Sequence, residues 1–539
     1  ELGLMKFDFL GLRTLTILQK AIEIINQKHN TDVNFYTIPN DDKKTFELFS
    51  RGETIGVFQF ESPPMQQYLK ELKPETQEDI CFLAAAYRPG AMAYISDYIK
   101  RKHGQQETQF LVPEMEAIVG KTYGFAIYQE QIIMIAVNIA GYSMGGADLL
   151  RRAMGKKKVE VMQKEEVKFK DGIKAKGMSD EVGKKLWEYL LPFADYGFNK
   201  AHAAGYAVLA YKCAYLKAHY PLEFMTALMH SDLEDLERVT IDIQEAKRMG
   251  YDVLAPNVNK SDIYFSTEGN NGIRFGLGAI KNVSIKVCEK IVIDRNENGP
   301  FKHMDDLVYR VGTSIINKRS LESLIKSGAM DEFGDRNSML QIMPEVLAKS
   351  SQKKKAKDDT QEDLFAMFAD ADVKPTAKKT EFQDVLEASD TDKMKWEKEL
   401  LGLFISTHPL QHFEWLKLFK DYETLNNVDT LRLGVPVKFV VTIANNKIVY
   451  TKKDNSKMAI LTLEDLTGKA DGVLFPRTYE KLNHFILDTS PLIIRGIVNE
   501  REERRSIIVN EIEHAKTLNA PSKITIDITG VSDQLELAS

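Results

Sequence analysis

The sequence of 539 residues lacks several features that would place a protein in a class at once. It has no run of about 18 apolar residues, so we expect no membrane-spanning helix. Its three cysteines, Cys81, Cys213 and Cys288, lie far apart, without a CxxC pair or a Cys/His cluster of zinc-ligand spacing. They are most simply free core thiols, which suits a reducing, cytoplasmic setting.

An excess of positive charge is also absent, because the formal net charge is -6. This balance argues against wholesale coating of nucleic acid, although binding depends on where the charge lies and not on its sum. The chain starts at Glu1 without an initiator methionine or a signal peptide, and the strand pattern at 522–530 has no room to become a domain. We therefore expect an internal piece of a longer protein.

What is present is a change of texture along a chain long enough for about three to five domains. Helical spacing of apolar residues runs through 12–27 and most of 40–230, and short strands and turns follow from 250. Residues 349–379 are charged and low in complexity, which predicts a flexible loop. Five alternating runs in 436–515, with a helix between the third and fourth, predict an OB-fold barrel. The fold class is multidomain α+β.

One carboxylate, Asp8, stands among apolar neighbours in LMKFDFLGLRTLT (4–16). In a strand it shares a face with Lys6, because side chains alternate with period two. Such an acid is either a salt-bridged surface residue or one ligand of a divalent cation. The residues alone leave both interpretations open.

A strongly basic stretch ends the segment SMGGADLLRRAMGKKK (143–158). It is not a Walker phosphate loop, because Lys157 follows Lys156 where Ser or Thr is needed, and the earlier glycine is missing. Cations favour the C-terminus of a helix, so a solvated helix end is one interpretation. The other is a triphosphate site, which suits an arginine cluster such as Arg151 and Arg152.

A second cationic stretch is YGFNKAHAAGYA (196–207), in which a loop enters a long Ala-rich helix. Lys200 and His202 lie in the first turn, and Tyr206 is at i+4 from His202. The start of a helix can hold phosphate, and an aromatic face can stack a base. Alternatively, His202 only caps or packs.

Six ordered motifs carry a family resemblance. They are MKFDFLGLRTLT (5–16), TIGVFQFES (54–62), AAYRPGAM (85–92), IYQEQIIMIA (127–136), DLLRRAMGKK (148–157) and FNKAHAAGYA (198–207). In this order the chain resembles the C-family replicative polymerases, the alpha subunits of bacterial DNA polymerase III, from residue 1 to about 518. Six ordered matches are far stronger evidence than any single motif.

The resemblance implies roles for these residues. Asp8 would be the third acid of a palm site that binds two Mg²⁺ ions, and its Asp-x-Asp partners are expected before residue 8, so 1–14 would be the end of the palm domain. Residues 15–250 would be the mostly helical fingers. Near the phosphates of the incoming deoxynucleoside triphosphate the fingers would place Arg151, Arg152, Lys156, Lys157, Lys200 and His202, with Tyr206 near its sugar or base. Arg88 would lie on the nucleotide or the template side.

The resemblance also divides the rest of the chain. Residues 251–432 would be a clamp-binding domain with a helix-hairpin-helix and a flexible clamp-motif loop (349–379), 433–518 the OB fold, and 519–539 the start of a C-terminal domain. The loop carries QEDLF (361–365), which resembles the sliding-clamp motif of this family. The clamp-binding residues would be Gln361, Asp363, Leu364 and Phe365, with the two apolar residues anchored in a pocket of the clamp.

One departure from the family concerns the hairpin AIKNVSIKVCEKI (279–291), where Asn282 and Ser284 replace two expected glycines. Asparagine tolerates a left-handed conformation and serine can donate, so phosphate contact stays possible, with more weight on Lys281 and Lys286. On the OB fold, stacking and charge predict contacts with single-stranded template. The candidates there are Phe439, Lys447, Tyr450, Lys452 and Arg495.

We therefore expect part of the catalytic subunit of a replicative DNA polymerase. Its partners would be primer-template DNA, deoxynucleoside triphosphates, the sliding clamp and other replicase subunits, with no membrane. By itself the chain would bind DNA and clamp without polymerising. One alternative is a non-catalytic tether, which predicts no nucleotide role for 143–207. A synthetase-like RNA binder is weaker, because no ATP-binding catalytic motif is present.

Overall fold

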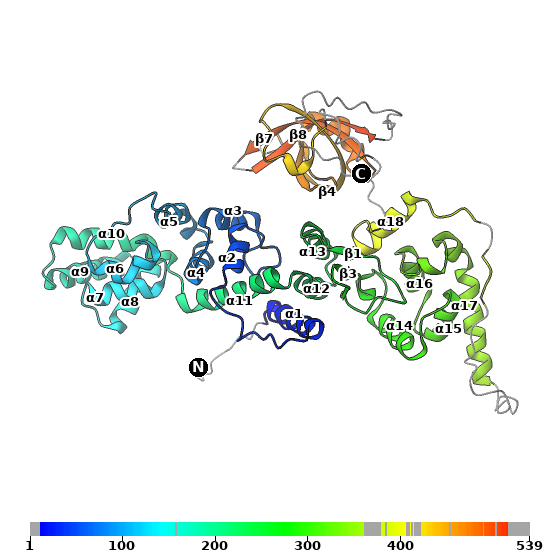
Figure 1. The fold of residues 1–539 in the computed structure, drawn as a ribbon. Coiled ribbons are helices and arrows are strands. Elements are labelled where there is room, and N and C mark those ends of the chain that lie inside the picture. The colour runs from blue at the N-terminus through cyan, green and yellow to red at the C-terminus, as the bar shows by residue number, and fades with distance from the viewer. Residues whose placement is uncertain are drawn as a thin grey trace, which may run out of the picture. The chain divides into compact units, whose positions relative to one another are not determined.

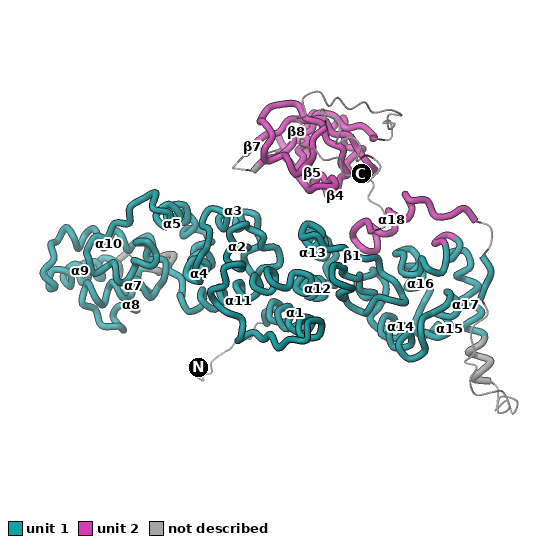
Figure 2. The backbone as a smooth tube through the Cα atoms, viewed as in Figure 1, with its two compact units in different colours: residues 1–334, 338–383 teal, residues 335–337, 384–539 magenta. Residues whose placement is uncertain are grey.

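The computed structural model describes residues 11–156, 159–359, 379–382, 385–405, 410, 413, 422–451, 454–488, 490–501 and 504–515. The chain forms two compact units, shown in teal and magenta in Figure 2. The first unit comprises Glu1–Gly334 with Ser338–Gln383, and the second comprises Asp335–Asn337 with Asp384–Ser539.

The first part of the first unit is helical, as the sequence predicts (Figure 1). Short 3-10 turns at Ala91–Tyr94 and Gly120–Thr122 interrupt the series. The helices are α1 Arg13–His29, α2 Lys43–Ser50, α3 Pro63–Leu72, α4 Gln77–Ala86, α5 Ile95–Lys102, α6 Glu114–Val119, α7 Gln129–Asn138, α8 Met144–Lys156, α9 Val159–Ala175, α10 Asp180–Tyr196, α11 Lys200–His219, α12 Pro221–Ser231 and α13 Leu236–Arg248.

Helix α11 is the centre of this part. It packs against α2, α4 and α12. Its buried side chains include Ala203, Ala207, Ala210 and Ala214, whose small size lets neighbouring helices approach closely. A helix that is apolar on nearly every side belongs in a core. The start of α11 is therefore held firmly by the elements around it.

A small sheet follows, with β1 Asp252–Leu254 parallel to β3 Gly272–Arg274 and β2 Ser266–Glu268 antiparallel to β3. After it come α14 Ile285–Asn298, α15 Met304–Val311 and α16 Lys318–Lys326. Gly276 lies so close to the sheet connection that a Cβ would stand 2.5 Å from the carbonyl carbon of Tyr264, which only glycine avoids. The short strands and turns that the sequence predicts from residue 250 are thus present.

Helix α17 runs from Arg336 to Asp359, so the predicted loop at 349–379 begins too early. The stretch is polar and rich in lysine, but lysine is a good helix former and the helix continues through it. The chain is next described at Lys379. Thr380 is buried there, where its hydroxyl donates to Asp305 Oδ1 (2.5 Å) and accepts from Lys349 Nζ (3.2 Å).

The clamp-motif residues lie between these two points. Gln361, Asp363, Leu364 and Phe365 fall outside the described residues. What the structure shows is that the chain leaves at the end of α17 and is fixed again at Thr380, against α15 and α17.

The second unit contains α18 Asp390–Leu401, whose Glu397 forms a buried ion pair with Arg336 (3.0 Å), and a barrel. The barrel strands are β4 Pro436–Tyr450, β5 Lys457–Glu464, β6 Lys469–Leu474, β7 Leu492–Arg501 and β8 Arg504–His514. They close in the order β4-β5-β6-β8-β7, and α19 Pro476–Leu482 lies between the third and fourth strands. The predicted OB fold is confirmed.

The barrel core corrects one predicted contact. Phe439 is completely buried, together with Val437 and Val441 on the same face of β4. A ring in that position cannot stack on a base, so the prediction that Phe439 touches nucleic acid is wrong. It fails because residues i, i+2 and i+4 of a strand share one face, and this face is the inward one.

Two expectations from the composition can be compared with the described residues. Cys81, Cys213 and Cys288 are all free and buried, so the prediction of core thiols is confirmed. No helix in the described part of the chain is long and apolar enough to span a membrane.

Candidate functional site

The start of α11 is pinned to the start of α7. Asn199 caps α11, because its side chain accepts from the His202 N–H (2.8 Å). Just before the cap, the Phe198 N–H donates to the Ile127 carbonyl (2.9 Å), and the Gln129 N–H donates to the Phe198 carbonyl (2.9 Å). The sequence-predicted helix start is confirmed, and its backbone is fixed on both sides of the cap.

A row of aromatic rings begins at this cap. The rings of Phe198 and His202 have centroids 5.5 Å apart, those of His202 and Tyr206 4.2 Å, and those of Tyr206 and Phe58 5.3 Å. The Arg88 guanidinium lies 4.3 Å from the Phe198 centroid, and its Nε donates to the Ala85 carbonyl (2.8 Å). Half-burial lowers the pKa of Arg88. The structure thus brings Arg88, His202 and Tyr206 together.

Lys200 lies beside this row and is already paired. Its Nζ is 3.0 Å from Glu78 Oε1, and its backbone N–H donates to both carboxylate oxygens of Glu130 (3.1 and 3.0 Å). The Glu130 carboxylate therefore sits at the N-terminus of α11, where the helix dipole favours an anion. A phosphate that approaches Lys200 has to compete with two carboxylates.

Helix α8 carries the second predicted cation group. Arg151 and Arg152 each place Nη2 2.8 Å from a carboxylate oxygen of Asp148. Arg151, as the larger influence, and Arg152 hold the pKa of Asp148 below its usual range. The Lys156 side chain and Lys157 fall outside the described residues. Within the described part, no recorded contact joins the α8 arginines to the residues around α11.

We give the name α11 cluster to Phe58, Arg88, Phe198, Lys200, His202 and Tyr206 together with the carboxylates Glu78 and Glu130. Four of these residues were not predicted from the sequence. Phe58 and Phe198 both occur in quoted motifs, and their aromatic character was the available signal. Glu78 and Glu130 gave none, because their partner Lys200 is 122 and 70 positions away.

The hairpin before α14 keeps the geometry that glycine would supply. Asn282 has φ +68°, so asparagine adopts the left-handed conformation. Its carbonyl accepts from Ser320 Oγ (2.9 Å), which ties the hairpin to α16. Ser284 caps α14 without using its hydroxyl on the helix, and Lys281 and Lys286 are exposed. No recorded hydrogen bond uses the N–H groups of residues 284–286, all of which are described, so these donors are available to a ligand.

On the barrel, some of the predicted nucleic-acid contacts are exposed and one is held by carboxylates. Lys447 and Tyr450 are exposed near the end of β4, where a base or a phosphate can reach them. Arg495 is held by Glu511 (2.8 Å) and Glu513 (2.7 Å), the first of which contributes most to raising its pKa. It lines a groove of about 480 Å³ with Arg477 and Lys481 of α19. Lys452 falls outside the described residues.

In the described part of the chain, no group of three or more His, Cys, Asp or Glu side chains is arranged so that it could hold a metal ion. Asp8 itself falls outside the described residues. The metal ligand predicted from the sequence is thus a residue whose surroundings the structure does not describe.

Two parts of the chain match families of known modules. Residues 250–339 match the helix-hairpin-helix motif, and residues 437–515 match the OB-fold nucleic acid binding domain. With the free hairpin donors and the exposed Tyr450, these matches define a multidomain protein of the nucleic-acid-binding class.

The helical region shows more closely which nucleic-acid-binding proteins the chain is similar to. Residues 14–177 match the bacterial DNA polymerase III alpha subunit finger domain. The resemblance of the sequence to the bacterial DNA polymerase III alpha subunits is thereby confirmed. Curated relatives named DNA polymerase III subunit alpha include those of Thermus aquaticus (39% identical over 98% of this chain), Borreliella burgdorferi (36%, 99%) and Bacillus subtilis (37%, 99%).

The matched share of these relatives is smaller. This chain covers 43% of the Thermus aquaticus protein, 46% of the Borreliella burgdorferi protein and 47% of the Bacillus subtilis protein. The chain therefore spans a little under half the length of the curated relatives that it matches.

Proposed function

We propose that this chain is part of the catalytic subunit of a replicative DNA polymerase, which adds deoxynucleotides to the 3′ end of a primer. The observation that carries the proposal is the row of rings and cations at the start of α11, inside a region related to polymerase fingers. Rings offer a stacking face to a base, and guanidinium and ammonium groups bind phosphate.

The pairing of the cations suggests how they act. Lys200 and Arg152 are held by Glu78 and Asp148 in this structure. A triphosphate carries several negative charges, so it attracts these cations more strongly than a single carboxylate does. Nucleotide binding is thus an exchange in which phosphate oxygens replace carboxylate oxygens around preformed cations.

Catalysis by this family is generally metal-dependent, and we propose Mg²⁺ at Asp8. When bound, two such ions would activate the primer 3′-oxygen and stabilise the leaving pyrophosphate. One carboxylate cannot hold two ions, so further acids must take part. The role assigned to the fingers residues does not depend on the ions, because they bind and orient the nucleotide.

The other modules supply partners. The hairpin donors and Lys286 would contact the phosphates of primer-template DNA, and Tyr450 and Lys447 of the OB fold would contact single-stranded template. The QEDLF segment would dock on the sliding clamp, which keeps the polymerase at the primer end. Other replicase subunits and a cytoplasmic location complete the proposal.

The test replaces Tyr206 with alanine in the complete natural polypeptide that carries these residues. Loss of one stacking ring costs about 1 to 3 kcal/mol of binding, so Tyr206→Ala should raise the KM for deoxynucleotide in primer extension by about 5- to 150-fold. Tyr36→Ala is the matched control, because Tyr36 is an almost fully exposed ring outside the cluster.

Two results would contradict the proposal. Absence of primer extension by the unmodified polypeptide would remove the polymerase assignment. An equal KM for Tyr206→Ala and Tyr36→Ala would remove the nucleotide role of the α11 cluster and favour the alternative, a non-catalytic tether that holds DNA and clamp.

A further inference from the structure

A tight loop between α2 and α3, residues 53–61, lies against α11 and is here named the 53–61 loop. It carries Phe58, whose ring meets the edge of Tyr206 at 5.3 Å and 77°. Gly56 has φ +80°, and a Cβ there would stand 2.6 Å from Leu228 Cδ2. Glycine therefore suits this point of the loop in both its conformation and its lack of a side chain.

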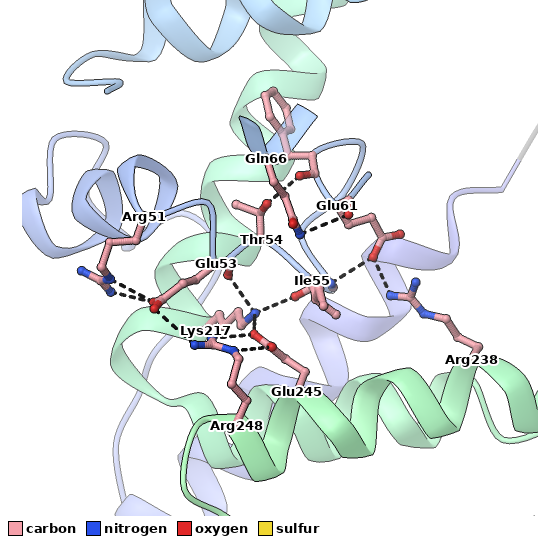
Figure 3. A network of polar contacts seen from close by, with 12 residues as sticks. Arg51, Glu53, Thr54, Ile55, Glu61, Gln66, Lys217, Arg238, Glu245 and Arg248 are labelled. Atoms are coloured by element: carbon pink, nitrogen blue, oxygen red, sulfur yellow. Dashed lines mark hydrogen bonds and ion pairs between the residues drawn. The ribbon is translucent and has the colours of Figure 1, made fainter. Parts of the chain in front are cut away.

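A buried ammonium group donates hydrogen bonds to one end of this loop (Figure 3). Lys217 of α11 has no exposed side-chain surface. Its Nζ donates to the Glu53 carbonyl (2.8 Å), the Ile55 carbonyl (2.8 Å) and Glu245 Oε1 (2.6 Å). An ammonium group has three protons, and here each has an acceptor.

Two arginines of helix α13 also hold the loop, one at each end. Arg248 reaches Glu53 Oε1 (3.3 Å) while it also binds Glu245 (2.7 Å). At the far end, Glu61 Oε2 accepts from the Gly56 N–H (3.0 Å) and from Arg238 Nη2 (2.5 Å). Figure 3 shows these contacts converging on the loop from two helices.

The residues of α11 that touch the loop form one stripe. Cys213 and Lys217 lie 7 and 11 positions after Tyr206, which places the three on the same face of a helix. Tyr206 meets the Phe58 ring, the buried Cys213 thiol takes a hydrogen bond from the Phe58 backbone, and Lys217 holds two loop carbonyls. The helix that presents Tyr206 therefore also fixes the side chain against which Tyr206 rests.

We propose that Lys217 is a positioning residue for nucleotide binding, which fixes the 53–61 loop so that Phe58 sets the orientation of the Tyr206 ring. The inference rests on the proposed function, since it concerns the same nucleotide site. It adds a residue that lies three turns along α11 from the cluster and touches no nucleotide. A methylene chain of the same length would fill the space of Lys217 but would leave the Glu53 and Ile55 carbonyls unheld.

The test uses the complete natural polypeptide and a pair of neutral replacements. Lys217→Met/Glu245→Gln removes the ammonium and neutralises its buried carboxylate partner, which would otherwise keep only its ion pair with Arg248. We expect the KM for deoxynucleotide to rise about tenfold while kcat changes less than about twofold, because orientation before binding is lost and the chemistry is not. Added to Tyr206→Ala, the pair should raise KM no further, because both changes act on one ring.

Two further variants separate positioning from loss of the fold. Phe58→Leu keeps the contacts of Lys217 with the 53–61 loop but removes the contact between the Phe58 and Tyr206 rings. It should therefore reproduce the rise in KM even if the paired variant unfolds. Lys212→Met is the control, because Lys212 is another buried lysine of α11, with its Nζ on the Ile38 carbonyl (2.5 Å). It should leave KM for deoxynucleotide unchanged.

The outcomes are distinct. A rise in KM for Tyr206→Ala without one for Phe58→Leu or for a folded Lys217→Met/Glu245→Gln would overturn the positioning role and leave the proposed function standing. The positioning role would also be overturned if the combined variant raised KM by the product of the rises caused by Tyr206→Ala and by the paired variant. No effect of Tyr206→Ala would instead overturn the proposed function itself.

Discussion

Asp242 should make the first unit less stable as the pH rises, and Asp242→Asn should abolish that effect. The side chain lies on α13 and is completely buried. Neither carboxylate oxygen has a hydrogen-bond partner among the described residues, and Arg238 Nε, at 3.4 Å from Oδ1, offers only an ion pair. Burial therefore outweighs the nearby arginine and raises the pKa of Asp242 to about 7.

The sign follows from proton binding. An unfolded chain releases the Asp242 proton near pH 3.8, whereas the folded chain keeps it until about pH 7. The folded state thus binds more protons in this window, so the free energy of unfolding falls as the pH rises through it. One unit of pKa corresponds to about 1.4 kcal/mol, and between pH 5 and pH 8 this single group lowers the stability by about 2.5 kcal/mol.

The measurement is urea unfolding of the chain at several values of pH between 5 and 8. Asparagine has nearly the same shape and does not titrate, so the difference in unfolding free energy between Asp242→Asn and the unmodified chain should grow with pH by about 2.5 kcal/mol. Asp97→Asn, which changes a half-exposed acid of α5, should give no such growth. Parallel pH profiles for Asp242→Asn and the unmodified chain would refute the reasoning.

Two further predictions concern binding. Glu78→Gln should lower the KM for deoxynucleotide in the complete polypeptide by about threefold, because it releases the Lys200 ammonium from an exposed ion pair; steady-state primer extension measures this, and an increased KM would contradict the exchange of carboxylate for phosphate. Leu364→Ala/Phe365→Ala should abolish binding of purified sliding clamp, because apolar side chains in a charged segment gain burial only in a partner; calorimetry with this chain tests it, and equal affinities would refute the clamp assignment.

Much of the fold could be predicted from local patterns. The start of α11 was predictable because Asn199 is a good cap and an Ala-rich stretch follows it. The barrel was predictable because alternation in 436–515 repeats between turn signals. The same alternation could have placed Phe439 inside, since it shares a face with Val437 and Val441. The loop boundary predicted at 349 is wrong because low complexity does not exclude a helix, and lysine favours one.

The site was less accessible to prediction. Motif order indicated Arg88, His202 and Tyr206, and the structure brings these together. Which carboxylate holds which cation is a property of tertiary packing between distant segments, so neither Glu78 nor its pairing could be inferred. Lys217 is the clearest case, because in the sequence it is a lysine near the end of a helix and in the structure it is completely buried.

The anchoring of the chain on both sides of residues 360–378 has a mechanical consequence. A peptide that hangs from one end passes a pull to a single attachment point. Here one side continues directly into α17, and the other is fastened at Thr380 to Asp305 of α15 and Lys349 of α17. A partner bound to the QEDLF segment would therefore pull on two helices of the folded unit at once, so the force would be shared between α15 and α17.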